Sequence, residues 1–372
     1  MRVLIAGDFA PSARLAHQID EERYSEIFPE NLRTVIKSAD FSFVNFESAI
    51  ADSECQPILK CGPNLKCSPK AADAICYAGF TGVTMANNHI LDFGSEGLKH
   101  SVECCKNLGL DVVGVGDNLM EANNVLYLEK NGKKLAVINC CEHEFSIATE
   151  TEAGANPLNP ICQHYAITEA RSKASYVLVI VHGGHEHFQL PSPRMQETYR
   201  FFIDAGADAV VNHHQHCYSG YEYYNGKPIF YGLGNFAFDL SSQKEETFWN
   251  RGFLVEFSFG ESIGFKIYPY RQYAETPSVE LLPEDSYRKE LKQLNAIIGN
   301  QTELRNAVSS YYQRCSKFEL SMFEPYSGRI FSKLLSMGLL PRFLPKKKAL
   351  MIRNHIECQS HRDKLIYAIK QK

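Results

Sequence analysis

Residues 207–220 of the sequence read ADAVVNHHQHCYSG, a short apolar run followed by three histidines within four positions. The apolar run at 209–211 predicts a buried strand. His214 and His216 stand two residues apart, so that on an extended chain their side chains face the same side and can bind one ion together. A buried strand that ends in imidazoles often presents metal ligands at the carboxyl edge of a sheet. Histidines also cluster in surface loops, so the rest of the chain must decide.

The same arrangement recurs along the first two thirds of the chain. Further short apolar runs, each ending in polar or glycine-rich residues, lie at 3–6, 41–44, 83–86, 135–138, 177–181 and 229–233. Helical patterns lie between them at 30–38, 69–78, 94–108 and 195–205. Gly206 is placed to cap the last of these helices. Strands alternating with helices predict α/β layers, in which the residues just past the strand ends meet in one crevice.

The predicted strand ends deliver a distinctive set of polar residues. They are Asp8, Glu47, Asn88, His89, His182, Glu186, His214 and His216. A two-metal hydrolytic centre needs such a mixture, because carboxylates neutralise and bridge cations while imidazoles and an amide complete the coordination. Taken singly, Asp8 could cap a helix, Glu47 could be a solvated loop residue, and Asn88 could belong to an Asx turn. Their joint occurrence at successive strand ends favours the metal centre.

Several stretches in order along residues 2–239 resemble the CapA family, the capsule or poly-γ-glutamate synthesis proteins of the metallophosphatase-like superfamily. These stretches are GDFAPSAR, VNFESAI, GVTMANNHILDFGSEGL, VVGVGDN, VHGGHEH, IDAGADAVVNHHQHC and GKPIFYGLGNFAFD. The resemblance implies a four-layer α/β/β/α sandwich, with two facing sheets flanked by helices. From residue 283 the pattern becomes charged and helical. We therefore expect a CapA-type domain over residues 1–278 and a basic helical extension over residues 279–372.

The resemblance also implies a role for each candidate residue. The metal ligands would be Asp8, Glu47, Asn88, His182, His214 and His216. Glu47 stands where phosphatases of the superfamily have their bridging aspartate. His89 would protonate the leaving group, and Glu186 would be a second catalytic residue. Arg14 and Asn235, which lie near strand ends, could hold an anionic substrate. One or two divalent ions (Mn, Fe or Zn) are the expected cofactors.

These assignments lead to two hypotheses for the function. The first is a metal-dependent hydrolase or transferase that acts on a phosphoester or an amide in capsular or other cell-surface polymer biosynthesis. Its partners would be an anionic polymer or its precursor and the capsule assembly proteins. The second is a non-catalytic assembly factor that keeps the fold and binds the polymer or a partner. It is motivated by Ala10, which stands where classical metallophosphatases have the histidine of their D-x-H motif.

Composition narrows the class of protein. The formal net charge of −4 gives no basis for nucleic-acid binding. No apolar run approaches the roughly 18 residues of a membrane span, and we expect a cytoplasmic protein. The sequence has 12 cysteines but no C-x-x-C pair, so we interpret them as buried apolar side chains in a reducing compartment rather than as a zinc ribbon.

The C-terminal segment differs from the rest in charge. Residues 326–372 contain 11 lysines and arginines against Glu357 and Asp363. They also carry an apolar patch of Leu339, Leu340, Phe343 and Leu344 beside three lysines at 346–348. We favour the interpretation that these helices pack on the acidic catalytic domain. The alternative is peripheral contact with anionic lipid at the inner membrane.

Overall fold

The computed structural model describes residues 1–370 except 53, 241–245, 322, 325–327 and 342. The chain divides into two compact units, Met1–Leu304 and Arg305–Lys372, each described here by itself. In the described part of the chain, no helix combines the length and the hydropathy needed to cross a bilayer.

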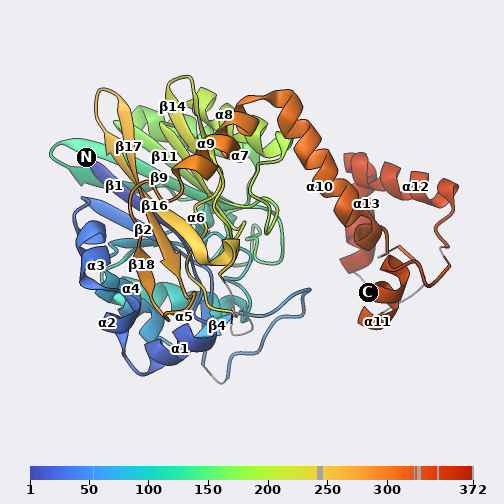
Figure 1. The fold of residues 1–372 in the computed structure, drawn as a ribbon, viewed down its shortest axis with the longest axis horizontal. Helices are drawn as coiled ribbons and strands as arrows, with labels where there is room; N and C mark the ends of the chain where they lie inside the picture. The colour runs from blue at the N-terminus through green and yellow to red at the C-terminus, as the bar shows by residue number, and fades with distance from the viewer. Residues whose placement is uncertain (53, 241–245, 322, 325–327, 342, 371–372) are drawn as a thin grey trace. The chain divides into compact units, whose positions relative to one another are not determined.

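The first unit is built on two large sheets (Figure 1). The first sheet has the order β18-β17-β16-β1-β2-β5-β6, and β15 also pairs with β1. These strands span Arg2–Phe9 (β1), Phe41–Phe46 (β2), Gly82–Thr84 (β5), Asp111–Val113 (β6), Asn235–Ala237 (β15), Arg251–Phe259 (β16), Ile263–Gln272 (β17) and Val279–Leu281 (β18). Strands β1, β2, β5 and β6 pair in parallel, whereas β16, β17 and β18 form an antiparallel extension.

The second sheet has the order β13-β14-β12-β11-β9-β8. Its strands span Leu126–Lys130 (β8), Lys133–Cys141 (β9), Tyr176–His182 (β11), Ala209–His213 (β12), Tyr221–Tyr224 (β13) and Lys227–Phe230 (β14). The central strands are parallel, and only the edge strands β8 and β13 run antiparallel. Strand β11 reads as the unbroken apolar run VLVIV because both of its faces are covered.

Helices complete a four-layer sandwich. The two sheets share a core in which Val3, Ile5 and Phe43 of the first sheet pack with Leu178 and Val211 of the second. The outer face of the first sheet is covered by α1 to α5, which span Ala13–Asp20, Tyr24–Ile27, Glu30–Lys37, Lys70–Ala78 and Gly94–Asn107. The second sheet is covered by α7 (Pro160–Lys173) and α8 (Pro193–Ala205). The α/β/β/α architecture expected from the sequence is therefore confirmed.

Smaller elements connect these layers. Two-stranded ribbons pair β3 (Ala49–Ile50) with β4 (Lys66–Cys67) and β7 (Val115–Gly116) with β10 (Gly154–Ala155). The remaining helices of the unit are α6 (Leu119–Ala122), a 3-10 turn at Phe248–Asn250 and α9 (Arg288–Gly299). Gly206 ends α8 with a φ of 123°, the backbone conformation that the predicted cap requires.

The second unit is helical. It contains most of α10 (Gln301–Ser321) together with α11 (Arg329–Ser336), α12 (Lys346–Glu357) and α13 (Gln359–Lys370). Helices α12 and α13 pack against each other. Several of its large apolar side chains are exposed, among them Leu339 and Phe343 of the predicted patch.

Candidate metal centre and active site

Five parallel strands from the two sheets bring the predicted ligands to one edge of the sandwich. Asp8 lies near the end of β1, Glu47 follows β2, Asn88 lies beyond β5, His182 ends β11, and the histidine pair follows β12. The six side chains belong to residues that are almost fully buried: Asp8 1%, Glu47 0%, Asn88 7%, His182 2%, His214 5% and His216 5% exposed. The sandwich thus buries a polar cluster where its two sheets end.

Asp8, Glu47 and His216 form the first of two groups of potential ligands that share Glu47. One donor atom from each lies within 4.8 Å of the others. Oδ2 of Asp8 is 3.6 Å from Nδ1 of His216, and Oε1 of Glu47 is 3.9 Å from Nε2 of the same ring. Asn45 donates to Oδ1 of Asp8 at 2.8 Å, which fixes the orientation of that carboxylate.

Glu47, His182 and His214 form the second group, also within 4.8 Å. Nε2 of His182 lies 3.0 Å from Oδ1 of Asn88, 3.1 Å from Nδ1 of His214 and 3.6 Å from Oε1 of Glu47. A ring nitrogen can donate at most one hydrogen, yet three potential acceptors converge on this one. Glu144 completes the surroundings, with Oε2 accepting from Nδ2 of Asn88 at 3.3 Å.

Glu47 belongs to both groups and is the most unusual residue of the cluster. Within the described part of the chain, neither of its carboxylate oxygens has a hydrogen-bond partner, although the residue is fully buried. A buried carboxylate without partners is costly unless a cation neutralises it. The unpaired oxygens and the surrounding imidazoles therefore fit divalent ions, one for each group, with Glu47 shared between them.

Electrostatics lead to the same interpretation. Burial raises the pKa of Glu47 well above its ordinary value, and the nearby Asp8 carboxylate raises it further. Burial lowers the pKa of His182, and His214 adds to this effect. For His216, burial would lower the pKa, but Glu47 and Asp8 raise it to about 9. The protein alone thus lacks the positive charge that these carboxylates require, and a divalent cation would supply it.

The H-x-H pair is not arranged as the sequence pattern suggested. Strand β12 ends at His213, so His214 and His216 do not alternate along a strand. Both have left-handed backbones, with φ of 88° and 53°. This conformation is unfavourable for residues other than glycine and is found where function requires it. The turns, rather than strand pleating, aim the two rings at the carboxylates, and the expectation of a shared strand face was wrong.

His89 faces the cluster with one nitrogen and an acidic partner with the other. Its Nε2 lies 4.0 Å from Oε1 of Glu47, and its Nδ1 lies 2.6 Å from Oδ2 of Asp92. Against an ionised carboxylate, which only accepts, Nδ1 is the donor, and the ammonium group of Lys60 lies 3.2 Å from the same nitrogen. Lys60, whose side chain is 2% exposed, forms an ion pair with the same carboxylate. This buried chain of contacts fixes the ring with Nε2 toward the metal ligands.

The remaining predicted residues occupy different surroundings. Asn235 is buried, and its Oδ1 lies 2.9 Å from Nδ1 of His216, so it orients that ring. Glu186 is exposed and offers a carboxylate oxygen within 4.8 Å of His214 and His216. The Arg14 guanidinium donates to both oxygens of Asp239, at 2.8 and 2.9 Å. Its position is therefore fixed by the protein itself.

Four residues of the site were not identified from the sequence. Asn45 could have been found, because it stands two positions before Glu47 and so faces the same side of the chain. Asp92 stands three residues after the histidine of the Asn-Asn-His stretch, within one helical turn. Lys60 and Glu144 come from loops, and no local pattern marks them.

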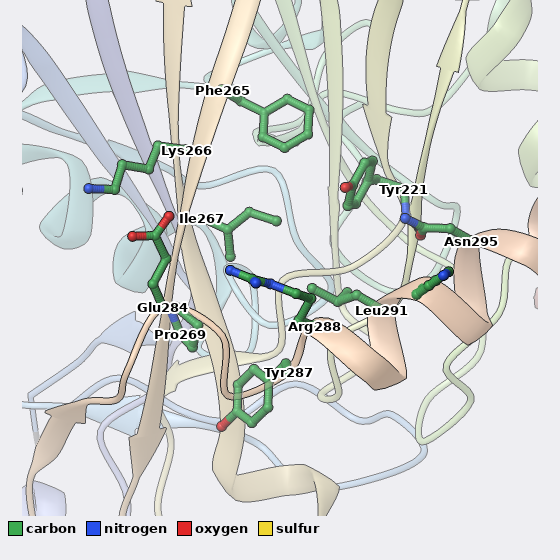
Figure 2. Close-up of a pocket in the computed structure, with 11 residues that line it drawn as sticks. Tyr221, Phe265, Lys266, Ile267, Pro269, Glu284, Tyr287, Arg288, Leu291 and Asn295 are labelled. Atoms are coloured by element: carbon green, nitrogen blue, oxygen red, sulfur yellow. Dashed lines mark hydrogen bonds between the residues drawn. The ribbon is translucent and has the colours of Figure 1, made fainter.

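A separate pocket of about 400 Å³ lies between β17, β13 and α9 (Figure 2). Tyr221, Phe265 and Leu291 contribute apolar surface to its lining. Arg288 reaches from the start of α9 toward Ile267. The charged lining residues are Lys266, Glu284, Arg288 and Lys292, a small excess of positive charge.

Comparison with known proteins places these features in a family. The model described as "Bacterial capsule synthesis protein PGA_cap" matches residues 2–240. The capsule biosynthesis protein CapA of Bacillus anthracis is 34% identical over 212 residues, which are 55% of this chain and 52% of that protein. The PGA biosynthesis protein CapA of Bacillus subtilis is 29% identical over 229 residues, 61% and 60% of the two chains. The matches thus span little more than half of either relative.

Two solved structures of low sequence identity align with the chain. A phosphatase from Mycoplasma pneumoniae aligns with a TM-score of 0.43 at 14% identity, covering 74% of this chain and 95% of that one. A hypothetical protein from Thermus thermophilus aligns with a TM-score of 0.46 at 16% identity, covering 72% and 99%. Shared function does not follow from values at this level. The family match covers more than half of the sequence and includes every candidate metal ligand described above, and the chain therefore belongs to the PGA_cap family of bacterial capsule synthesis proteins, the CapA family.

Proposed function

We propose that this chain is a metal-dependent hydrolase or transferase that acts on a phosphoester or an amide during the biosynthesis of a capsular or other cell-surface polymer. The observation that carries the proposal is Glu47, a buried carboxylate without hydrogen-bond partners in the described chain, which two ligand groups share. The names of the curated relatives support the biosynthetic context.

The donor set indicates which residues would hold the ions. Asp8 and His216 would bind one ion and His182 and His214 the other, with Glu47 common to both. A bound divalent ion would polarise the scissile group and lower the pKa of a water molecule. Mn, Fe and Zn all accept this mixture of nitrogen and oxygen ligands.

The protein's own contribution to catalysis lies in His89. Because Asp92 accepts from Nδ1, the Nε2 of His89 is left facing the cluster, where it delivers a proton to the leaving group. Asp92 holds the ring in this orientation and is itself neutralised by Lys60. Burial of all three groups excludes water, so the orientation is set before substrate arrives.

The proposal is tested with the purified full chain, loaded with Mn²⁺ and supplied with a chromogenic phosphodiester and a chromogenic amide. We expect turnover of at least one of them that disappears on chelation and in Asp8→Asn. Glu103→Gln, an exposed carboxylate on α5, serves as the matched control and should keep full activity. A chain that holds metal but turns over neither ester nor amide would contradict the proposal.

The pocket beside α9 favours a second candidate function, binding of an anionic polymer by a non-catalytic assembly factor. Lys266, Arg288 and Lys292 outnumber the single carboxylate of Glu284 in its lining. A polyanion such as poly-γ-glutamate would match this charge. Fluorescence anisotropy with labelled polyglutamate tests this candidate function. The double change Arg288→Glu and Lys292→Glu should abolish binding. Changing two exposed lysines away from this pocket to glutamate should leave binding unchanged.

A further inference from the structure

A second cluster of metal-binding side chains lies in the first unit and shares no residue with the centre described above. Asp52, Cys55 and His100 each offer one donor atom, and these atoms lie within 4.8 Å of one another. Asp52 and Cys55 come from the segment after β3, whereas His100 lies on α5. A carboxylate, a thiol and an imidazole thus meet between a loop and a helix.

Local structure explains why the loop presents its two ligands together. Oδ1 of Asp52 accepts from the backbone N–H of Glu54 at 2.8 Å and of Cys55 at 3.1 Å. These two bonds hold the carboxylate beside the backbone of the cysteine. The Cys55 residue is only 6% exposed and packs with Ala51 and Phe93. Its sulfur is therefore held in place rather than free in solvent.

The helix is fixed against the same segment. Oγ of Ser101, the residue after His100, accepts from the backbone N–H of Ile50 at 2.7 Å. Gly97, one turn earlier, packs beside Ala49, since a Cβ added at this glycine would lie 3.5 Å from that side chain, an ordinary packing distance. Both sides of the cluster are thus anchored within a few residues of the ligands, and an ion would meet a largely preformed site.

We propose that Asp52, Cys55 and His100 bind Zn²⁺ through three protein ligands, with water in the fourth tetrahedral position. Thiolate, imidazole and carboxylate are the three ligand types that Zn²⁺ accepts in proteins. The soft sulfur favours Zn²⁺ over harder ions such as Mn²⁺. Binding replaces the thiol proton of Cys55, which passes to solvent as the sulfur–zinc bond forms.

The position of the site suggests what the ion does. The segment that it would fasten to α5 continues to Lys60, whose buried ammonium group pairs with Asp92 behind His89. Zinc bound at Cys55 therefore restrains the chain five residues before this lysine. The ion would stabilise the position of this loop and would take no part in the proposed reaction.

Cobalt(II) tests the proposal, because a thiolate bound to this ion gives a charge-transfer band in the near ultraviolet. The candidate ligands at the sheet edge are nitrogen and oxygen atoms, so the band reports on the cysteine site alone. We expect the full-length wild-type protein, supplied with enough Co²⁺ to fill this site and the sheet-edge centre, to develop the band and to lose it when Zn²⁺ is added. Cys55→Ser should abolish the band, and His100→Ala should weaken Co²⁺ binding by about tenfold or more.

Cys61→Ser is the matched control, since Cys61 is an exposed cysteine of the same loop that lies outside the cluster. It should keep the band and its titration curve. Absence of the band in the wild-type protein, or its persistence in Cys55→Ser, would overturn the proposal. Neither outcome depends on turnover of a phosphodiester or an amide, so failure of this site and failure of the proposed function remain distinguishable.

Discussion

The sheet-edge centre and the C-terminal unit depart from ordinary burial in opposite directions. At the sheet edge, Asp8 and Glu47 carry carboxyl groups in residues that are 1% and 0% exposed. In the C-terminal unit, Ile330 and Leu339 are apolar residues that are 75% and 64% exposed. Buried carboxylates require a cation or a proton, and clustered exposed apolar side chains mark surfaces that meet another surface. The sheet edge therefore indicates a cationic partner, and the C-terminal unit indicates an apolar surface as its partner.

The largest effect is expected from breaking the sheet-edge centre itself. His216→Ala removes a ligand whose ring is held by Asn235 and lies beside both Asp8 and Glu47. Metal content and phosphodiester turnover should fall together. Turnover should fall by more than about 10⁴-fold, which is the upper limit expected for the loss of a single general acid. His213→Ala is the control, because this buried neighbour belongs to neither ligand group. Equal metal loss in both variants would contradict the assignment.

His89→Ala separates proton transfer from metal binding. We expect the metal content of this variant to match that of the wild type, while turnover falls by about 10²–10⁴-fold. His17, whose side chain is 68% exposed, provides a control position. If His89→Ala lost metal as readily as His216→Ala, His89 would be a ligand rather than the acid.

Lys60→Met tests the buried support of His89. Its partner Asp92 would lose the buried cation that neutralises it, and the free energy of unfolding should fall by about 3 kcal/mol. The control is Lys70→Met, which breaks an exposed pair with Glu22 and should cost less than about 1 kcal/mol. Urea denaturation of the metal-loaded proteins measures both. Equal losses would show that burial does not strengthen the Lys60 pair.

The smallest effect concerns the C-terminal unit. Leu339 and Phe343 beside lysines 346–348 are the residues on which the lipid hypothesis rests, whereas packing of these helices on the first unit is the interpretation we favour. Under the lipid hypothesis, the full chain sediments with anionic vesicles in a salt-sensitive way, at about 1 kcal/mol for each cation near the surface. Changing the three lysines to glutamate should abolish this sedimentation, whereas the same change at Lys130, Lys133 and Lys134 should not. A wild-type chain that does not sediment with such vesicles would support the packing interpretation.

The sequence could predict those features that depend on local burial. Strands such as β11 were predicted because burial on both faces leaves an unbroken apolar run, and the candidate ligands were selected because each follows such a run. His182 and Asp8 therefore required no knowledge of distant contacts. The layered fold itself came from the family resemblance, which the structure confirms.

Other parts of the site depend on contacts that no local pattern encodes. Lys60 reaches Asp92 from a loop more than thirty positions away in the sequence, and Glu144 approaches Asn88 from beyond β9. The left-handed backbone at His214 is stabilised by its surroundings, including an N–H that donates to Asp8 at 3.2 Å. Such features follow from the assembled sheets, so they become visible only in three dimensions.

The central claim is that Glu47 is shared by two metal-binding groups, and the Mn²⁺ content of the Glu47→Gln variant tests it most directly. Elemental analysis after loading and dialysis should find two Mn²⁺ ions in the wild-type chain, one for each ligand group. In Glu47→Gln, the loss of a shared negative charge should deplete both ions, with Glu103→Gln unchanged. A wild-type chain that retains no Mn²⁺, or a Glu47→Gln chain that retains the wild-type amount, would contradict the account.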